Sequence, residues 1–286
     1  MDLPAGFHIG AMREDEVPIL EDWAAKEGWN PGLADLQIAH AIDPEAFIAL
    51  REGEHLAGGG TIFRHGPRLG FMGLFIMRAD LRQQGLGAIL WTWRRDAMLG
   101  RLEPGATVGM DGVFAMVPFY EKGGFRLAYR DLRYQGIARG RGAAGTEVLG
   151  DADFNEIEAL DRACFGAPRN SFLARWLAQE GAHVLGLRQA GRLVAYGVAR
   201  PCRVGFKIGP LFADSAEYAR RVLADILARV DGQQVQIDVP EPNEAGLRIA
   251  ADFGLAMTFG CARLYLGPDP ELPVKRIFGV TSFEFG

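Results

Sequence analysis

The stretch Gly70-Phe-Met-Gly-Leu-Phe-Ile-Met-Arg-Ala-Asp-Leu-Arg-Gln-Gln-Gly-Leu-Gly-Ala-Ile-Leu-Trp91 changes from a continuous apolar run to a pattern with helical spacing. The apolar run ends at Met77 and predicts a buried β-strand, and the residues from Gly87 to Leu99 predict a helix. Because Gly85 and Gly87 lie where the strand turns into the helix, backbone N–H groups are left uncovered at the positive end of the helix. Such a turn is suited to bind an anion such as a pyrophosphate. The alternative is that both glycines only let the helix pack closely on the strand.

The composition is that of a folded chain with an acidic balance. Its 286 residues predict two domains, and with 49% hydrophobic and 23% charged residues we expect packed cores. A net charge of −5 argues against a general nucleic-acid-binding protein. No apolar run reaches the roughly 18 residues that a membrane-spanning helix needs, and the N-terminus does not resemble a secretory signal. We therefore expect a cytoplasmic protein with no nucleic-acid or membrane partner.

The cysteines and histidines do not predict a metal centre. Cys164, Cys202 and Cys261 are far apart, and the five histidines form none of the spacings typical of metal-binding motifs. We therefore predict no metal site and three buried, reduced thiols.

Residues 139–145, Arg-Gly-Arg-Gly-Ala-Ala-Gly, show neither the two-residue apolar period of a strand nor the 3.6-residue period of a helix. They predict a linker between domains at 1–138 and 146–286. The segment also matches the dinucleotide-binding pattern G-x-G-x-x-G. That function requires a helix after the last glycine, whereas the residues that follow predict a strand. We favour the linker.

The two sides of this linker align with each other. Gly60 falls on Gly197 and, after one contraction, Arg133 falls on Arg263. Such in-register matches suggest a duplication, and chance similarity between domains of like composition is the alternative. Each half predicts mixed strands with interspersed helices, so the fold class is α/β, with a mixed sheet of the α+β kind in each half.

The opening stretch resembles motif A of the GNAT superfamily of N-acetyltransferases, whose signature is Q/R-x-x-G-x-G/A. Arg82, Gly85 and Gly87 fill its defining positions. Downstream, Ala115-Met-Val-Pro-Phe-Tyr-Glu-Lys-Gly-Gly-Phe125 is similar to the superfamily's motif B, A-x-x-x-x-Y-E-K-x-G-F. The second half looks like a further GNAT fold, and the chain is similar to bacterial tandem-GNAT proteins of the YitH type. The resemblance therefore implies two tandem GNAT folds.

The resemblance implies acetyl-coenzyme A as the donor of an acetyl group that passes directly to a primary amine in a ternary complex. The turn would bind the pyrophosphate, with Arg82 at its mouth, and the pantetheine arm would lie along the end of the preceding strand. A backbone N–H near Met77 would polarise the thioester carbonyl. The cofactor-binding residues predicted in this way are Phe75, Ile76, Met77, Arg82, Gln83, Gln84, Gly85, Leu86, Gly87 and Ala88.

Tyr120 occupies the family's general-acid position, where a phenol can protonate the departing thiolate; a tyrosine of the core is the alternative. We assign no general base. Asp111 and Glu27 are candidates, but both also fit solvated surface acids, and a water chain would also serve. Val113 stands where the family usually has an asparagine, which removes a polar contact near the cofactor.

The second half departs further from the family pattern. It keeps an asparagine, Asn243, at that motif B position, but Ala250 replaces the tyrosine. Its strand-to-helix turn is predicted to place Val222 and Ala224 where the first half has its two glycines. Their β-carbons would obstruct a pyrophosphate, and the carboxylates of Asp214 and Glu217 would repel it.

We therefore expect the second domain to brace the first and to wall its acceptor site, without binding coenzyme A in the usual way. A shifted cofactor mode is the alternative. Trp23, Trp29 and Phe63 are candidates to line the acceptor pocket, with core packing as the other interpretation.

The sequence as a whole predicts an acetyl-CoA-dependent N-acetyltransferase, an acyltransferase of the EC 2.3.1 class, whose first domain is active. We expect a small-molecule amine as acceptor more than a protein, and a homodimer is possible. The alternative is a non-catalytic sensor or scaffold that binds acyl-CoA; Tyr120 beside intact turn glycines favours the enzyme.

Overall fold

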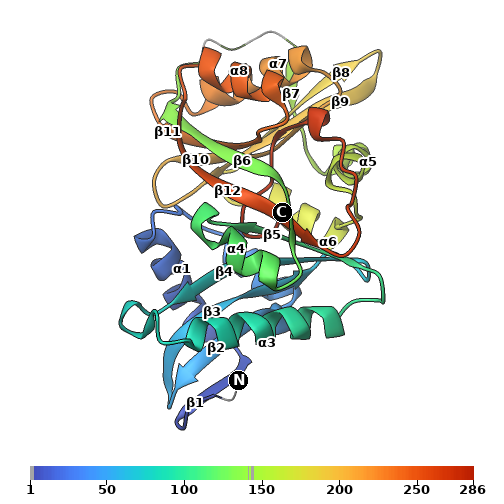
Figure 1. Cartoon of the computed structure of the whole chain (residues 1–286). Helices are drawn as coiled ribbons and strands as arrows, with labels where there is room; N and C mark the ends of the chain where they lie inside the picture. Colours follow the sequence, from blue (N-terminus) through green and yellow to red (C-terminus); the bar gives the residue numbers. More distant parts are fainter. Residues whose placement is uncertain (1–2, 141, 143–144) are drawn as a thin grey trace.

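The computed structural model describes residues 3–140, 142 and 145–286, so positions 141, 143 and 144 of the predicted linker lie outside the described residues. Its two halves repeat one order of elements (Figure 1). The first half consists of β1 (Phe7–Ala11), α1 (Val17–Lys26), α2 (Asp35–Ile42), β2 (Phe47–Glu52), β3 (His55–Arg64), β4 (Leu69–Met77), α3 (Leu86–Gly100), β5 (Thr107–Gly112), α4 (Val117–Lys122) and β6 (Arg126–Ile137). The second consists of β7 (Thr146–Val148), α5 (Phe154–Phe165), α6 (Asn170–Leu177), β8 (His183–Gln189), β9 (Arg192–Pro201), β10 (Phe206–Ala213), α7 (Ala216–Arg229), β11 (Gln234–Pro240), α8 (Glu244–Asp252) and β12 (Ala256–Leu266), followed by β13 (Ile277–Gly279).

The strands form one mixed 13-stranded sheet in which the halves exchange their last strands. The order is β1-β2-β3-β4-β5-β12-β6-β11-β10-β9-β8-β7, with β13 paired to β10. β12 of the second half thus lies between β5 and β6 of the first, and β6 lies between β12 and β11. Figure 1 shows these two strands side by side across the middle of the molecule. Each half is completed by a strand of the other.

Two buried ion pairs connect the exchanged strands to their hosts. Arg263 on β12 binds Asp111 on β5 through two hydrogen bonds of 2.7 Å. In the related position of the other half, Arg133 on β6 binds Asp238 on β11 at 2.7 and 2.8 Å. The two arginines that align in the sequence therefore make the same contact, each with an aspartate of the opposite half.

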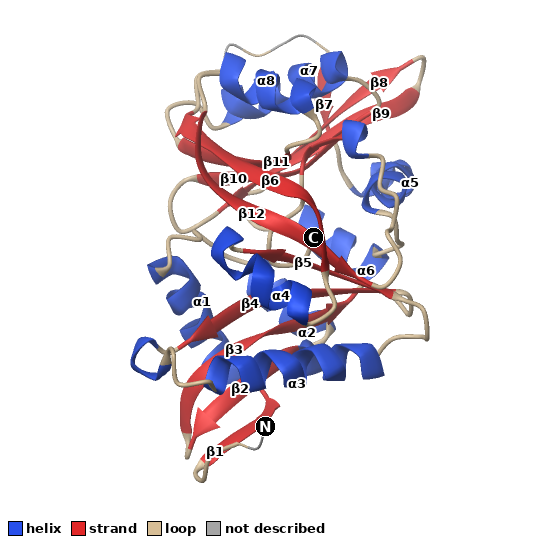
Figure 2. Ribbon diagram, viewed as in Figure 1, coloured by secondary structure: helices blue, strands red, loops and turns tan. Residues whose placement is uncertain are grey.

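The helices pack in groups against the strands (Figure 2), and three apolar cores lie between the helices and the sheet. One lies under α3 and α4, one under α7 and α8, and one is shared by α1, α2, α5 and α6 of both halves. The predicted buried thiols are confirmed, since all three cysteines are buried and unpaired. Among the described residues, no helix is both long and apolar enough to span a membrane, and no cluster of three or more metal-ligating side chains occurs.

One sequence-based placement in the second half is wrong. Helix α7 begins at Ala216, directly after Asp214 and Ser215, so these two residues alone form the strand-to-helix turn. Val222 and Ala224 lie within α7 and not at its turn, and Val222 packs in the core. The contraction between the halves therefore falls mostly before the helix, whereas the sequence alignment placed it after the helix.

Candidate active site

The central feature of the first half is a gap in its sheet. Strand β4 pairs in parallel with β5 only from Leu69 to Met72. Directly beyond this point β4 contains a bulge, since Leu74 has a positive φ of 52° and the register with β3 shifts there. The segment from Gly73 to Met77 therefore has no ladder partner on its β5 side. A gap of this kind leaves backbone groups and space for a ligand.

At the end of β4, the turn of residues 78–85 leads into α3. Gln83 and Gly85 have positive φ values of 63° and 84°, which turn the chain into the helix. Within the described part of the chain, no backbone or side-chain acceptor takes the N–H groups of residues 83–87; the N–H of Ala88 is the first to bond, to the Gly85 carbonyl at 3.0 Å. Five successive donors at the positive end of a 15-residue helix form a cradle for an anion.

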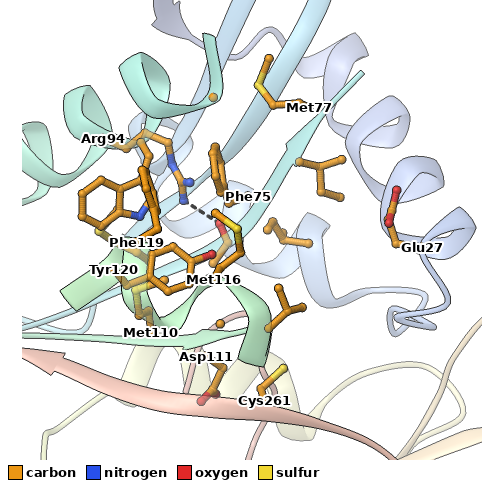
Figure 3. Close-up of a pocket in the computed structure, with 18 of the residues that line it drawn as sticks. Glu27, Phe75, Met77, Arg94, Met110, Asp111, Met116, Phe119, Tyr120 and Cys261 are labelled. Atoms are coloured by element: carbon orange, nitrogen blue, oxygen red, sulfur yellow. Dashed lines mark hydrogen bonds between the residues drawn. The ribbon is translucent and has the colours of Figure 1, made fainter. Parts of the chain in front are cut away.

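A pocket of about 550 Å³ extends from this turn through the gap between β4 and β5 (Figure 3). It brings together eight of the ten predicted cofactor-binding residues and the predicted acid. These are Phe75, Ile76, Met77, Arg82, Gln83, Gly85, Gly87, Ala88 and Tyr120. Gln84 and Leu86 do not line it: the side chain of Gln84 donates to the Asp80 carbonyl at 2.8 Å, and that of Leu86 is buried in the core.

Tyr120 projects from α4 toward the pocket, near Arg94 (Figure 3). Burial raises the pKa of Tyr120 to about 12, although the positive charge of Arg94 acts in the opposite direction. No hydrogen bond to its hydroxyl occurs among the described residues. The phenol therefore stays protonated at neutral pH and is available as a proton donor.

Three carboxylates line the pocket, and they differ in how firmly they are paired. Glu27 forms an ion pair with Arg82, and Asp111 is bound by Arg263. Glu284, near the C-terminus, is buried, and its Oε2 has no hydrogen-bond partner within the described chain. Its nearest cation is Lys207, at 3.9 Å from Oε1. Glu284 is thus the pocket carboxylate most available to accept a proton.

Sequence reasoning did not find Glu284, because nothing in its local pattern points to the first half. The tail returns there: the Phe285 carbonyl lies 2.7 Å from His65 Nε2, and a β-carbon at Gly73 would lie 2.2 Å from the Glu284 carbonyl. Of the three aromatic candidates for the acceptor pocket, only Trp29 lines it. Phe63 is buried, and Trp23 packs against the same shared core.

In the second half, the corresponding gap is filled by the chain itself. Strand β10 pairs with β11 only at Phe206–Ile208, and the short strand β13 then pairs with the remainder of β10. Asn243, the motif B asparagine, donates to the Ile277 carbonyl of β13 at 2.9 Å. At the start of α7, Ser215 accepts the Tyr218 N–H. β13 therefore occupies the strand edge that stays open in the first half, and Ser215 caps the first turn of α7.

The comparisons with known proteins agree with this arrangement. A model described as "Acetyltransferase (GNAT) family" matches residues 11–125, and one described as "Acetyltransferase (GNAT) domain" matches residues 157–279. The chain is 26% identical to a holothin acyltransferase of Pseudoalteromonas sp. (strain SANK 73390), over 95% of this chain and 92% of that protein. It is 25% identical to the uncharacterized N-acetyltransferase YitH of Bacillus subtilis (strain 168), over 80% of each.

A crystal structure of a putative acetyltransferase from Pyrococcus horikoshii has the same fold, with a TM-score of 0.83 at 21% identity, over 100% of this chain and 98% of that one. Together with the two family models, this confirms the predicted fold class and the resemblance. The chain belongs to the GNAT acyltransferase superfamily and carries two GNAT domains in tandem.

Proposed function

We propose that the first half, residues 1–138, transfers an acyl group from acyl-coenzyme A to a primary amine in a ternary complex. Acetyl is the group that the sequence leads us to expect. The observation that carries the proposal is the pocket itself, which joins an unpartnered row of N–H donors, an open strand edge and a protonated phenol. In the second half β13 fills the strand edge, the strand-to-helix turn is shortened to two residues, and Ala250 stands in place of the tyrosine.

The pocket fits the parts of an acyl-CoA. The donors of residues 83–87 suit the pyrophosphate, and the unpaired edge from Gly73 to Met77 suits the amide groups of a pantetheine arm. Arg82 is held in place by two contacts, its Nε donating to the Met77 carbonyl at 3.0 Å and its Nη2 paired with Glu27. When bound, the acyl-CoA supplies a thioester carbonyl that an amine can attack.

Two side chains would move the protons of this reaction. The amine nitrogen forms a bond to the carbonyl carbon, and the carbon–sulfur bond breaks. Glu284 takes the proton that the attacking ammonium group must lose, and Tyr120 gives its phenolic proton to the leaving thiolate. As the adduct collapses to the amide, its nitrogen loses a second proton, which restores the Tyr120 phenol through solvent, and Glu284 releases its proton to solvent.

The other two pocket carboxylates are less suited to act as the base. Burial raises the pKa of Asp111, and its oxygens are already bound by Arg263. Glu27 neutralises Arg82 at the mouth of the pocket. The carboxylates that line the pocket, those of Glu27, Asp111 and Glu284, favour a small cationic amine as the acceptor.

Thiol release measured over a panel of amines tests the proposal. Replacing the acid (Tyr120→Phe) or the base (Glu284→Gln) should lower kcat by about a hundredfold, the lower end of the range for general acid–base catalysis. Matched controls outside the pocket, Tyr134→Phe and the exposed Glu271→Gln, should leave the rate unchanged.

The same assay separates the enzyme from a scaffold. Tight acyl-CoA binding without thiol release for any amine would favour the non-catalytic alternative. An unchanged rate in Tyr120→Phe would remove that residue from the mechanism.

A further inference from the structure

Arg94 places a cation without a counter-ion at the inner end of the pocket. It lies on α3 and is 1% exposed. Its Nη2 donates to the carbonyl oxygens of Thr61 and Gly73 at 2.5 and 2.6 Å, whereas Nε and Nη1 are buried and have no partner in the described chain. Burial lowers the pKa of Arg94 to about 9, which leaves it charged at neutral pH. A buried charge with unmet donors is costly and calls for a partner.

The fold itself does not require a cation at this place. A β-carbon at Gly60 on β3 would lie 2.4 Å from the Arg94 Cζ, so this glycine makes room for the guanidinium. In the second half, Gly197 takes the place of Gly60, and a β-carbon there would meet the methyl group of Ile226 at 2.9 Å. The same helix-on-sheet contact is therefore made by an apolar side chain in the half whose strand gap is filled by β13.

The position of Arg94 indicates which part of a ligand it would meet. Its partner Gly73 begins the unpaired segment of β4, four residues or roughly 13 Å from Met77, beside the phosphate turn. Figure 3 shows Arg94 on the side of the pocket that holds Tyr120 and Phe119, opposite Glu27. With the pantetheine arm along the unpaired edge from Met77 to Gly73, the thioester would lie beside Gly73 and not at Met77 as the sequence resemblance implies, so its acyl chain would end near Arg94. An amine would approach from the side of Glu27 and Trp29.

A second unmet donor lies on the same face of α3. The indole Nε1 of Trp91 is buried without a partner among the described residues, and Trp91 lines the pocket one helical turn before Arg94. Around them the wall is apolar, with Met72, Met110 and Phe119. This end of the pocket therefore offers donors at its tip and apolar contacts along its sides.

We propose that Arg94 and Trp91 bind the terminal carboxylate of the transferred acyl group, so that the preferred donor is a thioester of a short dicarboxylic acid. The inference rests on the proposed acyl transfer and specifies its substrate class. The methylene groups of such a chain suit the apolar wall, and its carboxylate supplies the counter-ion that Arg94 lacks. The carboxylate takes no part in the bond changes at the thioester.

Titration calorimetry of the full chain with four ligands tests this inference: CoA, acetyl-CoA, butyryl-CoA and succinyl-CoA. Succinyl-CoA has the four-carbon chain of butyryl-CoA with a carboxylate in place of the terminal methyl group. It should bind at least about tenfold more tightly, because a site with buried donors rejects a ligand that lacks their partner. Arg94→Met should abolish or reverse this preference. Arg94→Lys should retain part of it, and Arg64→Met, exposed and outside the pocket, should retain all of it.

Three results would count against the inference. Equal or weaker binding of succinyl-CoA in the wild-type protein overturns it, whether or not Arg94→Met folds. A preference found only between carboxylated and uncarboxylated amine acceptors would assign Arg94 to the acceptor instead. If Arg94→Met lowers kcat equally for every donor and leaves the order of affinities unchanged, Arg94 acts by lowering the pKa of Tyr120 and not by binding the acyl group. If no thioester binds, the proposed function itself fails.

Discussion

The two halves share one fold, and they differ in what lies beside the strand edge that the fold leaves open. In the first half β4 parts from β5 after Met72, and a pocket continues through the gap. In the second half β10 parts from β11 after Ile208, and β13 pairs with the free edge. The difference shows that the fold provides a vacant strand position, which a ligand or the chain's own tail can occupy.

The two strand-to-helix turns also differ in their charged and hydrogen-bonding groups. Among the described residues, the five N–H donors of residues 83–87 are unpartnered in the turn and the first turn of α3, whereas α7 begins directly after Ser215, which caps it. Asp214, which would repel a pyrophosphate, forms ion pairs with Arg192 and with Arg276, the residue before β13. The acidic turn of the second half thus anchors the segment that fills its gap.

The largest effect is expected in the turn between β4 and α3, where a substitution should remove the difference in acyl-CoA binding between the two halves. Gly85→Glu should abolish acyl-CoA binding in titration calorimetry, a loss of more than about a hundredfold, because a glutamate would be strained at a φ of 84° and would repel the pyrophosphate. Gly85→Asn, which tolerates this backbone conformation and carries no charge, should bind much better than Gly85→Glu.

The matched control lies in the second half. Glu217→Gln, at the exposed start of α7, should leave both the affinity and the stoichiometry of one acyl-CoA per chain unchanged. Two sites per chain would contradict the comparison, since the second gap would then be accessible.

The next largest effect compares the stability that the two equivalent ion pairs give to the exchanged strands. Asp238→Asn leaves the buried guanidinium of Arg133 without its carboxylate, and we expect a loss of about 3–5 kcal/mol in the free energy of unfolding. Asp111→Asn should cost less, about 1–2 kcal/mol, because Arg263 keeps a second carboxylate, Asp131, at 3.5 Å.

Urea unfolding of both variants measures this difference. Equal losses would show that Asp131 gives Arg263 no support. A loss below about 1 kcal/mol in Asp238→Asn would show that the pair is not needed to hold β6 against β11.

The sequence predicted the parts of the fold whose signals are local. The predicted strand ends at Met77 as observed, and the helix predicted from Gly87 to Leu99 differs from α3 by one residue at each end, because apolar runs and helical spacing are read within one segment. The alignment of Arg133 with Arg263 was also informative, since both lie on equivalent strands. The alignment could not show that each arginine pairs with an aspartate of the other half, because the apolar pattern of a strand does not specify which strands lie beside it.

The candidate site was predictable to the same extent. The turn and Tyr120 belong to contiguous motifs, and the structure brings them to one pocket. Glu284 enters that pocket through a tail that lies far away in the sequence, and Arg94 resembles any other charged residue of an amphipathic helix. Ungapped alignment misplaced the turn of the second half because the helical pattern of α7 continues on both sides of Val222.

The smallest effect concerns a buried position at which the exchanged strands differ in charge. Asp131 on β6 lies opposite Cys261 on β12, and both are buried. Burial raises the pKa of Asp131 well above the ordinary aspartate range, and the neighbouring Asp111 raises it further, against the opposing charge of Arg263. Burial also raises the pKa of Asp111, against the charge of the same arginine.

This raised pKa fixes the sign of a pH dependence. Between the ordinary pKa of about 4 and the raised native value, the folded chain binds more protons than the unfolded chain, so stability falls as the pH rises. Asp131→Asn removes this proton, and its amide can donate to Asp111. We expect the variant to unfold like the wild type at pH 5 and to be more stable by about 1 kcal/mol at pH 8. Urea unfolding at both pH values measures it, and a variant less stable than the wild type at pH 8 would mean that Arg263 needs both carboxylates in their charged form.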